Sequence, residues 1–431
     1  MSDETKQGFA TRSIHAGASP DPTTGARSVP INQATAFVFK DADHAAALFG
    51  LEESGFIYSR LTNPTVSVFQ ERVASLEGGV GATCTASGHS AQLLALFAVM
   101  DSGDEFVASN KLYGGSITQF GHTFKKFGWT VKFVDPVDPE NFRKAVTAKT
   151  KAFFTESLAN PGGVVCDIEA IAKIAHESGV PCIVDNTLPS PALCRPIEHG
   201  ADIVVHSTTK FISGHGNAMG GAVVDSGKFD WAKEPKKYPM LNEPDPSYHG
   251  VIYTEALGPA AFIGRCRVVP LRNTGAALSP HSAFLIMQGL ETLGLRIKQH
   301  CENALALAKY LEGHESVEWV NYAALPNDKY NALCKKITNG QASGIISFGI
   351  KGGIEAGTKF IDALQMILRL VNIGDAKSLA CHPASTTHRQ LNPEELALAG
   401  VSEDMIRISV GIEHIDDIIQ DVEQAIEASK K

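Results

Sequence analysis

Between residues 64 and 225 the chain alternates short apolar runs with segments of helical spacing. Strands that are apolar on both faces, with helices between them, are typical of a parallel sheet covered by helices on both sides. We therefore predict an α/β protein built on a mostly parallel sheet. The predicted strands are EFVASN (105–110), TVKFVD (130–135), KAFFTES (151–157), PCIVDN (181–186) and ADIVVHS (201–207).

Helical spacing predicts three helices in the same region, over 65–78, 91–100 and 168–180. The first is amphipathic and ends at Gly78, whereas the second is apolar all round and is expected to be buried. Residues 228–262 break the alternation. They are rich in proline, lysine and aromatic residues, which predicts a long ordered loop.

The chain has 431 residues, more than one compact domain usually holds, so we expect two domains. Residues 1–63 are rich in turn formers and predict an extended N-terminal arm. Residues 64–262 would form the large domain, and residues 263–431 a smaller α+β domain. In the smaller domain we expect a helical stretch over 280–313, strands at 344–350 and 405–411, and a closing amphipathic helix over 415–429.

Composition narrows the class of protein. The formal net charge is −9 and there is no long basic run, which disfavours nucleic acid and anionic membranes as partners. No stretch offers the roughly 20 apolar residues of a membrane span, and the N-terminal residues lack the basic start and apolar core of a signal peptide. The eight cysteines are scattered without a CxxC pair. We therefore expect no metal centre, no disulfide framework and a cytoplasmic location.

Ligands of an open parallel sheet bind beyond the carboxyl ends of its strands, so the polar residues at those ends are the candidates for a site. A helix N-terminus beside them would favour an anion such as phosphate, because its N–H groups are free and its dipole is positive there. The residues in these places are Glu156, Asn160, Asp185, Ser207, Thr209 and Lys210, with Gly88 and His89 at the predicted helix start and Tyr113 in a loop.

Three of these features point to one cofactor. The Lys210 amine could form a Schiff base with an aldehyde, the Asp185 carboxylate could keep a pyridine nitrogen protonated, and the helix start at Gly88 could hold a phosphate. Taken singly, each has an ordinary explanation as a loop lysine, a turn aspartate or a backbone glycine. As an ordered set they indicate pyridoxal 5′-phosphate.

Longer motifs resemble a known family, the pyridoxal-phosphate enzymes of Cys/Met metabolism, which have fold type I and are related to the cystathionine lyases and synthases. The likeness covers nearly the whole chain. Its motifs, in order, are IHAG (14–17), YSRLTNPT (58–65), SGHSA (87–91), LYGGS (112–116), ESLANP (156–161), IVDNT (183–187), HSTTKFISGHG (206–216), HPASTTH (382–388) and IRISVGIE (406–413).

The resemblance implies roles for residues around the cofactor. Lys210 would be the Schiff-base lysine and the proton shuttle, and Asp185 would pair with the pyridine nitrogen. Asn160 would contact the ring hydroxyl, and Tyr113 would stack on the ring and assist as acid or base. The phosphate would be held by Gly88, His89, Ser207 and Thr209. The glycines that follow the lysine, Gly214 and Gly216, would let the backbone turn close to the cofactor.

The resemblance also implies a shared active site and a substrate site. Tyr58 and Arg60 would reach the phosphate of a neighbouring subunit, so the site needs a dimer, within a homotetramer that is a dimer of dimers. Asn372, Ser378 and Arg407 would bind the substrate, with Arg407 on its α-carboxylate, because a forked guanidinium suits a planar carboxylate. Without the family, a surface ion pair would be the simpler explanation of Arg407.

Three features favour the O-acetylhomoserine sulfhydrylases within this family: the insertion NEPDPSYHG (242–250), the segment NIGDAKSL (372–379), and the length of the chain. We expect γ-replacement, in which O-acetyl-L-homoserine and sulfide give L-homocysteine and acetate for methionine biosynthesis. The alternative is a cystathionine γ-synthase or methionine γ-lyase. The sequence does not determine whether the leaving group of the substrate is acetyl, succinyl or phospho. It also does not determine whether the sulfur comes from free sulfide or from a protein sulfur carrier, or what role the His89 side chain has.

Two other classes of protein fit less well. A nucleotide-binding oxidoreductase would carry G-x-G-x-x-G after an early strand, and TASGHSA (85–91) is not that motif. A non-catalytic relative would not need the intact set of Lys210, Asp185 and Arg407.

Overall fold

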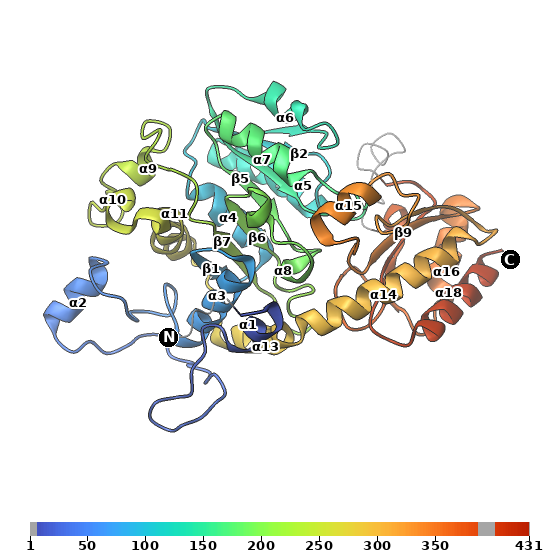
Figure 1. Ribbon diagram of the computed structural model, residues 1–431, viewed down its shortest axis with the longest axis horizontal. Coiled ribbons are helices and arrows are strands. Elements are labelled where there is room, and N and C mark those ends of the chain that lie inside the picture. Colours follow the sequence, from blue (N-terminus) through green and yellow to red (C-terminus); the bar gives the residue numbers. More distant parts are fainter. Residues whose placement is uncertain (1–6, 387–400, 431) are drawn as a thin grey trace.

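The computed structural model describes residues 7–386 and 401–430, so the last two residues of the 382–388 motif and the ends of the expected arm and C-terminal domain lie outside it. The described residues form a larger sheet of seven strands, in the order β1-β7-β6-β5-β4-β2-β3, and a smaller sheet of five (Figure 1). The strands of the larger sheet are β1 (Gly81–Thr85), β2 (Glu105–Ser109), β3 (Thr130–Val134), β4 (Thr150–Glu156), β5 (Cys182–Asp185), β6 (Ile203–His206) and β7 (Gly221–Asp225).

The larger sheet is mostly parallel. The five strands predicted from the apolar runs are confirmed as β2 to β6, and each pairs in parallel with its neighbours among them. Strands β1 and β7 were not predicted. They pair with each other in antiparallel fashion, and β7 is also antiparallel to β6. Both missed strands start at a glycine, which in the sequence looks like a loop.

Helices cover both faces of this sheet, as predicted. Neighbouring residues of β4 point to opposite sides, so that Phe153 belongs to one buried cluster and Phe154 to the other. Helices α3 (Pro64–Glu77) and α7 (Ile168–Glu177) contribute to the first cluster. Helices α4 (Gly88–Phe97) and α11 (Ala261–Cys266) contribute to the second.

The ends of these helices follow from local sequence. The Asn63 side chain accepts hydrogen bonds from the N–H groups of Thr65 and Val66 at the start of α3, and Pro64 occupies the first helical position. The helix ends at Gly78 in the left-handed conformation, with φ of 82°. The three predicted helices of this region are therefore confirmed, with ends that differ by a few residues.

Two helices connect the larger sheet to the smaller one. The helical stretch expected over 280–313 is divided at Thr292 into α13 (Pro280–Glu291) and α14 (Leu293–Glu312). Helix α14 runs from the large sheet to the small one (Figure 1). The small sheet has the order β10-β11-β12-β9-β8. Its strands contact α14 and α16, and α18 packs against both of these helices.

The predicted strands and closing helix of the C-terminal part are confirmed as β9, β12 and α18. The elements of this part are β8 (Val317–Asn321), α15 (Asn331–Thr338), β9 (Ile345–Ile350), α16 (Gly353–Ala363), β10 (Leu368–Arg369), β11 (Leu379–Cys381), β12 (Met405–Ser409) and α18 (Ile415–Ser429).

The prediction of one long loop over 228–262 is wrong in part. The segment contains α9 (Pro239–Asn242) and α10 (Tyr253–Leu257) and leads into α11. Aromatic side chains such as Tyr238 and Tyr253 are buried in the same cluster as α4, which folds the segment into helical turns against the sheet. The domain boundary proposed at residue 262 would therefore fall inside α11, which packs on β1 and β7.

The N-terminal segment contains α1 (Phe9–His15), which packs against α3, and α2 (Ala42–Phe49), which projects from the body of the molecule (Figure 1). No helix among the described residues is both long and apolar enough to cross a membrane. The shorter helices are α5 (Gly114–Thr118), η2 (Gln119–Thr123), η3 (Phe124–Phe127), α6 (Glu140–Ala145), α8 (Ser190–Leu193), η4 (Pro196–His199), η5 (Gly258–Ala260), η6 (Arg267–Leu271), α12 (Arg272–Thr274) and η7 (Pro383–Ser385).

Candidate active site

A cavity of about 210 Å³ opens at the carboxyl ends of β4, β5 and β6. This is where an open parallel sheet places its ligands. Its walls come from the part of the chain that forms the larger sheet and, at Asn372 and Arg407, from the C-terminal part of the chain. The cavity brings together most of the residues predicted from the sequence, namely Gly88, His89, Tyr113, Asn160, Asp185, Ser207, Thr209, Lys210, Asn372 and Arg407.

One end of the cavity is suited to a phosphate. Gly88 is the first residue of α4, and the Ser87 side chain caps the helix by accepting a hydrogen bond of 3.2 Å from Ser90 N. A Cβ on Gly88 would lie 2.7 Å from Ser207 Cβ, so glycine is required for the helix start to approach Ser207. The N–H groups at the first turn of a helix lack partners within the helix and bind anions.

The hydroxyl-bearing residues Ser207 and Thr209 border the same end of the cavity. Thr209 Oγ1 donates to Gly220 O at 3.2 Å and accepts from Gly220 N at 3.0 Å, which fixes its rotamer. Ser207 N donates to Thr187 Oγ1 at 2.8 Å, and Thr187 is a cavity residue that the sequence analysis did not select.

Asp185 ends β5 with its carboxylate oriented by three hydrogen bonds. Thr187 donates to Oδ1 from its N–H at 3.0 Å and from its hydroxyl at 2.5 Å. Gln92 Nε2 donates to Oδ2 at 3.0 Å. These hydrogen bonds fix the orientation of a carboxylate that could pair with a pyridine nitrogen.

Glu156 ends β4 directly opposite Asp185 in the β4–β5 pair. Its carboxylate accepts from Tyr113 N at 2.6 Å and from Asn160 N at 3.4 Å. Burial raises the pKa of Glu156, and the neighbouring charge of Asp185 raises it further. Glu156 therefore fixes the main chain of two predicted site residues, Tyr113 and Asn160, although the sequence analysis gave it no role.

The Tyr113 side chain stands at the cavity with 46% of its surface exposed. The His89 ring meets it edge-on, with 5.9 Å between ring centroids and an angle of 82°. The two rings cover the side of the cavity near the start of α4.

Lys210 lies in the turn after β6, and its amine donates a hydrogen bond of 2.6 Å to Asn372 Oδ1. Burial lowers the pKa of Lys210 from 10.5 to about 8, and the positive charge of Arg407 contributes. A lysine with this pKa is partly neutral near physiological pH, so its amine can act as a nucleophile or as a base.

Arg407 on β12 presents a buried guanidinium to the cavity, with 8% of its surface exposed. It donates to Asn160 Oδ1 at 3.4 Å and to Asn372 O at 3.2 Å, and its Nε has no hydrogen-bond partner. Both acceptors are neutral, and no carboxylate of the described residues forms an ion pair with it. A buried cation facing a cavity without a counter-ion is suited to a ligand carboxylate.

Three predicted site residues lie away from the lining of this cavity. The Ser378 hydroxyl is buried and donates to Glu413 Oε2 at 2.9 Å while it accepts from Gly411 N at 2.8 Å. Tyr58 and Arg60 are exposed, with the Arg60 guanidinium carbon 5.5 Å from the centre of the Tyr58 ring.

The sequence analysis missed Gln92, Thr187, Met219 and Val371 among the cavity residues. Gln92 could have been selected from the sequence, because it is a polar residue in an otherwise apolar predicted helix. Met219 and Val371 are 68% and 52% exposed at the cavity and resemble ordinary surface residues in the sequence.

The residues present fit pyridoxal phosphate. A lysine amine, a hydrogen-bonded carboxylate and a helix start with two hydroxyl-bearing residues border one cavity, and these groups match the aldehyde, the pyridine nitrogen and the phosphate. The cavity also carries a guanidinium that the cofactor would leave free for a substrate.

Comparisons with known proteins agree with this chemistry. Residues 10–427 match the family model described as Cys/Met metabolism PLP-dependent enzyme. The chain is 52% identical over 425 residues to the O-acetyl-L-homoserine sulfhydrylase of Leptospira meyeri, covering 96% of each chain. It is 49% identical to the homocysteine synthase of Schizosaccharomyces pombe, covering 98% of each chain.

A solved structure is also similar. The crystal structure of a putative O-acetylhomoserine (thiol)-lyase from Campylobacter jejuni, which carries a pyridoxyl-lysine monophosphate, superimposes with a TM-score of 0.94. The two chains are 43% identical, and the match covers 98% of this chain and all of that one.

Proposed function

The chain belongs to the Cys/Met metabolism PLP-dependent enzymes, and from this premise we propose that it is an O-acetylhomoserine sulfhydrylase. It converts O-acetyl-L-homoserine and sulfide to L-homocysteine and acetate. The bond from Cγ to the acetyl oxygen breaks, acetate leaves, and a bond from Cγ to sulfur forms. The chain is 52% identical to a sulfhydrylase and 49% identical to a homocysteine synthase over nearly the full length of each, which supports this reaction over the other reactions of the family.

The observation that carries the proposal is the pairing of Lys210 and Arg407 in one cavity. Arg407 has only neutral acceptors and offers its guanidinium to the substrate α-carboxylate. Lys210, with its pKa lowered to about 8 by burial and by Arg407, is suited to attach the cofactor and to move the substrate Cα proton. The two residues would thus fix one end of an amino acid and act on its Cα.

Bound pyridoxal phosphate supplies an electron sink that stabilises negative charge on the substrate carbon. Asp185, held by Gln92 and Thr187, would keep the pyridine nitrogen protonated. Tyr113 would cover the ring, and Asn160 would bind its hydroxyl. The start of α4 at Gly88 and His89, with Ser207 and Thr209, would hold the phosphate.

The test is an assay of the purified protein with O-acetylhomoserine and sulfide, measuring homocysteine and acetate. We expect turnover with this pair and a visible absorption band of the bound cofactor that Lys210→Ala abolishes. The same assay with O-succinylhomoserine identifies the acyl group. Cysteine as nucleophile, or methionine as the only substrate, tests the cystathionine γ-synthase and methionine γ-lyase alternatives. A protein that takes up no pyridoxal phosphate would overturn the proposal.

We also propose that the enzyme is a homotetramer, a dimer of dimers, in which Tyr58 and Arg60 complete the phosphate site of a neighbouring subunit. Both residues are exposed and neither lines its own cavity, which supports this role. The exposed apolar side chains of Val38 and Phe56 lie in the same N-terminal segment. Light scattering gives the mass, and mixing inactive Arg60→Ala with inactive Lys210→Ala would restore part of the activity only if sites are shared.

We also propose a cytoplasmic location, because of the state of the cysteines. All eight cysteines are free and buried, so none forms a disulfide of the kind found in oxidising compartments.

A further inference from the structure

The last carbonyl groups of the turn that carries Lys210 need hydrogen-bond donors from other parts of the chain. Residues 208–213 form this turn, in which Ser213 N donates to Thr208 O at 3.0 Å and Gly214 N donates to Lys210 O at 2.8 Å. Gly214 then takes the left-handed conformation, with φ of 71°, and the chain leaves the turn. As at the end of a helix, the last carbonyl groups of such a turn require donors from elsewhere.

Arg296 on α14 supplies these donors. Its Nη1 donates to Phe211 O at 2.9 Å and its Nη2 to Ile212 O at 3.2 Å. Nη2 also donates to Gly289 O at 2.7 Å, and Nε donates to Thr292 Oγ1 at 3.3 Å. Each of the three guanidinium nitrogens therefore has a hydrogen-bond partner, and the two residues that it holds in the turn are the two that follow Lys210.

The two glycines after the lysine turn the backbone, with φ of 71° at Gly214 and 63° at Gly216, and they also make room for neighbouring side chains. A Cβ on Gly214 would collide with the Arg296 guanidinium, and a Cβ on Gly216 would collide with the Asp375 carboxylate. Burial lowers the pKa of Arg296 to about 10, an effect that the charge of Asp375 opposes, so Arg296 is charged at neutral pH.

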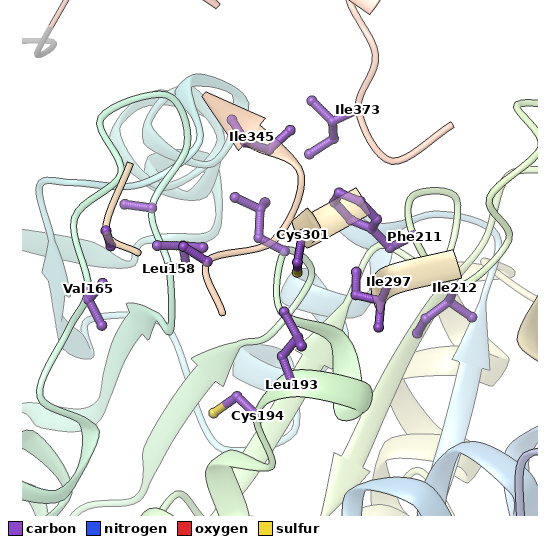
Figure 2. Packing of buried hydrophobic residues seen from close by; sticks show 14 of the residues in the cluster. Leu158, Val165, Leu193, Cys194, Phe211, Ile212, Ile297, Cys301, Ile345 and Ile373 are labelled. Atoms are coloured by element: carbon purple, nitrogen blue, oxygen red, sulfur yellow. The ribbon is translucent and has the colours of Figure 1, made fainter. Parts of the chain in front are cut away.

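Packing and hydrogen bonds hold the turn from two sides. Phe211 and Ile212 pack in one buried cluster with Ile297 of α14 (Figure 2). On the other side, Ala376 N donates to Gly214 O at 2.9 Å, in the same segment whose Asn372 accepts from the Lys210 amine. The turn is thus fixed between α14 and the 372–376 segment.

We propose that Arg296 is a positioning residue for Lys210. By binding the carbonyl groups of Phe211 and Ile212, it holds the turn in the conformation from which the Lys210 amine reaches the cofactor and the substrate Cα. A lysine could not replace it, because one ammonium group cannot bind several carbonyl groups in a fixed fork. This inference rests on the proposed role of Lys210 as the cofactor lysine.

The chain offers a matched control for a merely structural arginine. Arg265 is 8% exposed, close to the 6% of Arg296. Its Nη1 binds two successive carbonyl groups, Phe97 O at 3.3 Å and Ala98 O at 2.9 Å. These groups lie at the end of α4 that is remote from the cavity. Arg265→Lys therefore removes hydrogen bonds from an arginine to two successive carbonyl groups away from the site, together with a contact of 3.7 Å between Arg265 Nε and Asp245 Oδ2.

The experiment compares wild-type holoenzyme with Arg296→Lys and Arg265→Lys. For each we measure the Tm, the visible spectrum of the bound cofactor, the fraction of Lys210 labelled after borohydride reduction, kcat and KM. We expect both variants to have a lower Tm than the wild type. Only Arg296→Lys should lower kcat, by about 100-fold for a displacement on the order of 1 Å, with KM largely unchanged and with less labelled Lys210. A variant that keeps wild-type kcat and labelling would overturn the inference.

A second pair of variants covers the case in which Arg296→Lys does not fold. Gly214→Ala places a Cβ where the guanidinium lies. Gly103→Ala has a comparable left-handed backbone, with φ of 95°, and meets no atom within 4 Å. We expect reduced labelling of Lys210 in the first variant alone, and equal labelling in the two would contradict the inference. If the wild type shows no visible band, the proposed function itself fails, whereas a normal wild type with normal variants removes only the role of Arg296.

Discussion

Lys210→Met should stabilise the protein without cofactor, and it should do so only in a defined range of pH. Methionine is close to lysine in length and carries no charge, so it removes the cost of keeping an ammonium group in the cavity. Burial and the nearby charge of Arg407 hold the pKa of Lys210 at about 8, against an ordinary value of 10.5. The unfolded chain therefore binds a proton more readily at this residue than the folded chain does.

The size of the effect follows from that difference. One pKa unit corresponds to about 1.4 kcal/mol, so the folded apoprotein is destabilised by about 3 kcal/mol at or below pH 7. The cost decreases as the pH rises through about 8 and disappears above 10.5, where Lys210 is neutral in both states. The variant also loses the hydrogen bond from Lys210 to Asn372. That loss, about 1 kcal/mol, lowers the advantage of the variant but changes its pH dependence little.

The measurement is urea unfolding of the two apoproteins at several values of pH between 7 and 10. We expect the stability of the wild type to approach, and then exceed, that of Lys210→Met as the pH rises. Lys125→Met, at an exposed lysine, is the control and should show a constant difference. A difference between wild type and Lys210→Met that does not change with pH would refute the argument that the cavity disfavours the charged amine.

Three further outcomes follow from the geometry of the cavity. Arg407→Lys should raise the KM for the amino-acid substrate about tenfold or more, because the forked contact with a carboxylate is lost, while the cofactor spectrum stays unchanged. Gln92→Leu removes the hydrogen bond to Asp185 Oδ2, which we expect to weaken cofactor binding about tenfold in an equilibrium titration, from a loss of about 1.5 kcal/mol; unaltered affinity would contradict the role given to Gln92. Gly88→Ala should weaken phosphate-dependent cofactor binding because its Cβ would lie 2.7 Å from Ser207 Cβ, whereas Gly162→Ala, with its nearest neighbour at 3.8 Å, should not.

The parts of the fold that the sequence predicts are those whose signal is local. Strands β2 to β6 are short runs of apolar residues between polar ends, and such runs are recognisable without knowing their partners. Strand β7 follows Gly220 and begins at Gly221, and its place between β1 and β6 depends on antiparallel pairing that no local pattern shows. The 228–262 segment looked like a loop because its apolar residues are spaced irregularly, and it is helical in part because they bury against distant helices.

The residues of the site also divide into those with a local signal in the sequence and those whose role depends on distant partners. Asp185 and Lys210 were predictable because each follows a buried strand of the same sheet, and parallel strands bring their carboxyl ends to one edge. Ser378 was less predictable in detail, because Glu413, 35 residues further along, accepts the hydrogen bond of its hydroxyl. The left-handed turn at Gly214 agrees with its predicted role, but the side-chain contact that requires a glycine there was not predictable. The partner in this contact, Arg296, lies on α14, and no local pattern in the sequence places that helix beside the lysine turn.

Asn372 joins the two halves of the site through different atoms. Its side chain accepts the hydrogen bond from the Lys210 amine, and its main-chain carbonyl accepts one from Arg407. A substrate carboxylate would add its negative charge and a second, parallel hydrogen bond to the contact with Arg407, which the single neutral carbonyl of Asn372 does not offer. It would therefore displace the carbonyl of Asn372 while the side chain still holds the lysine. Asn372 would thus keep the amine in place when Arg407 binds the substrate, which is a reason for an amide, with its neutral acceptor, at this position.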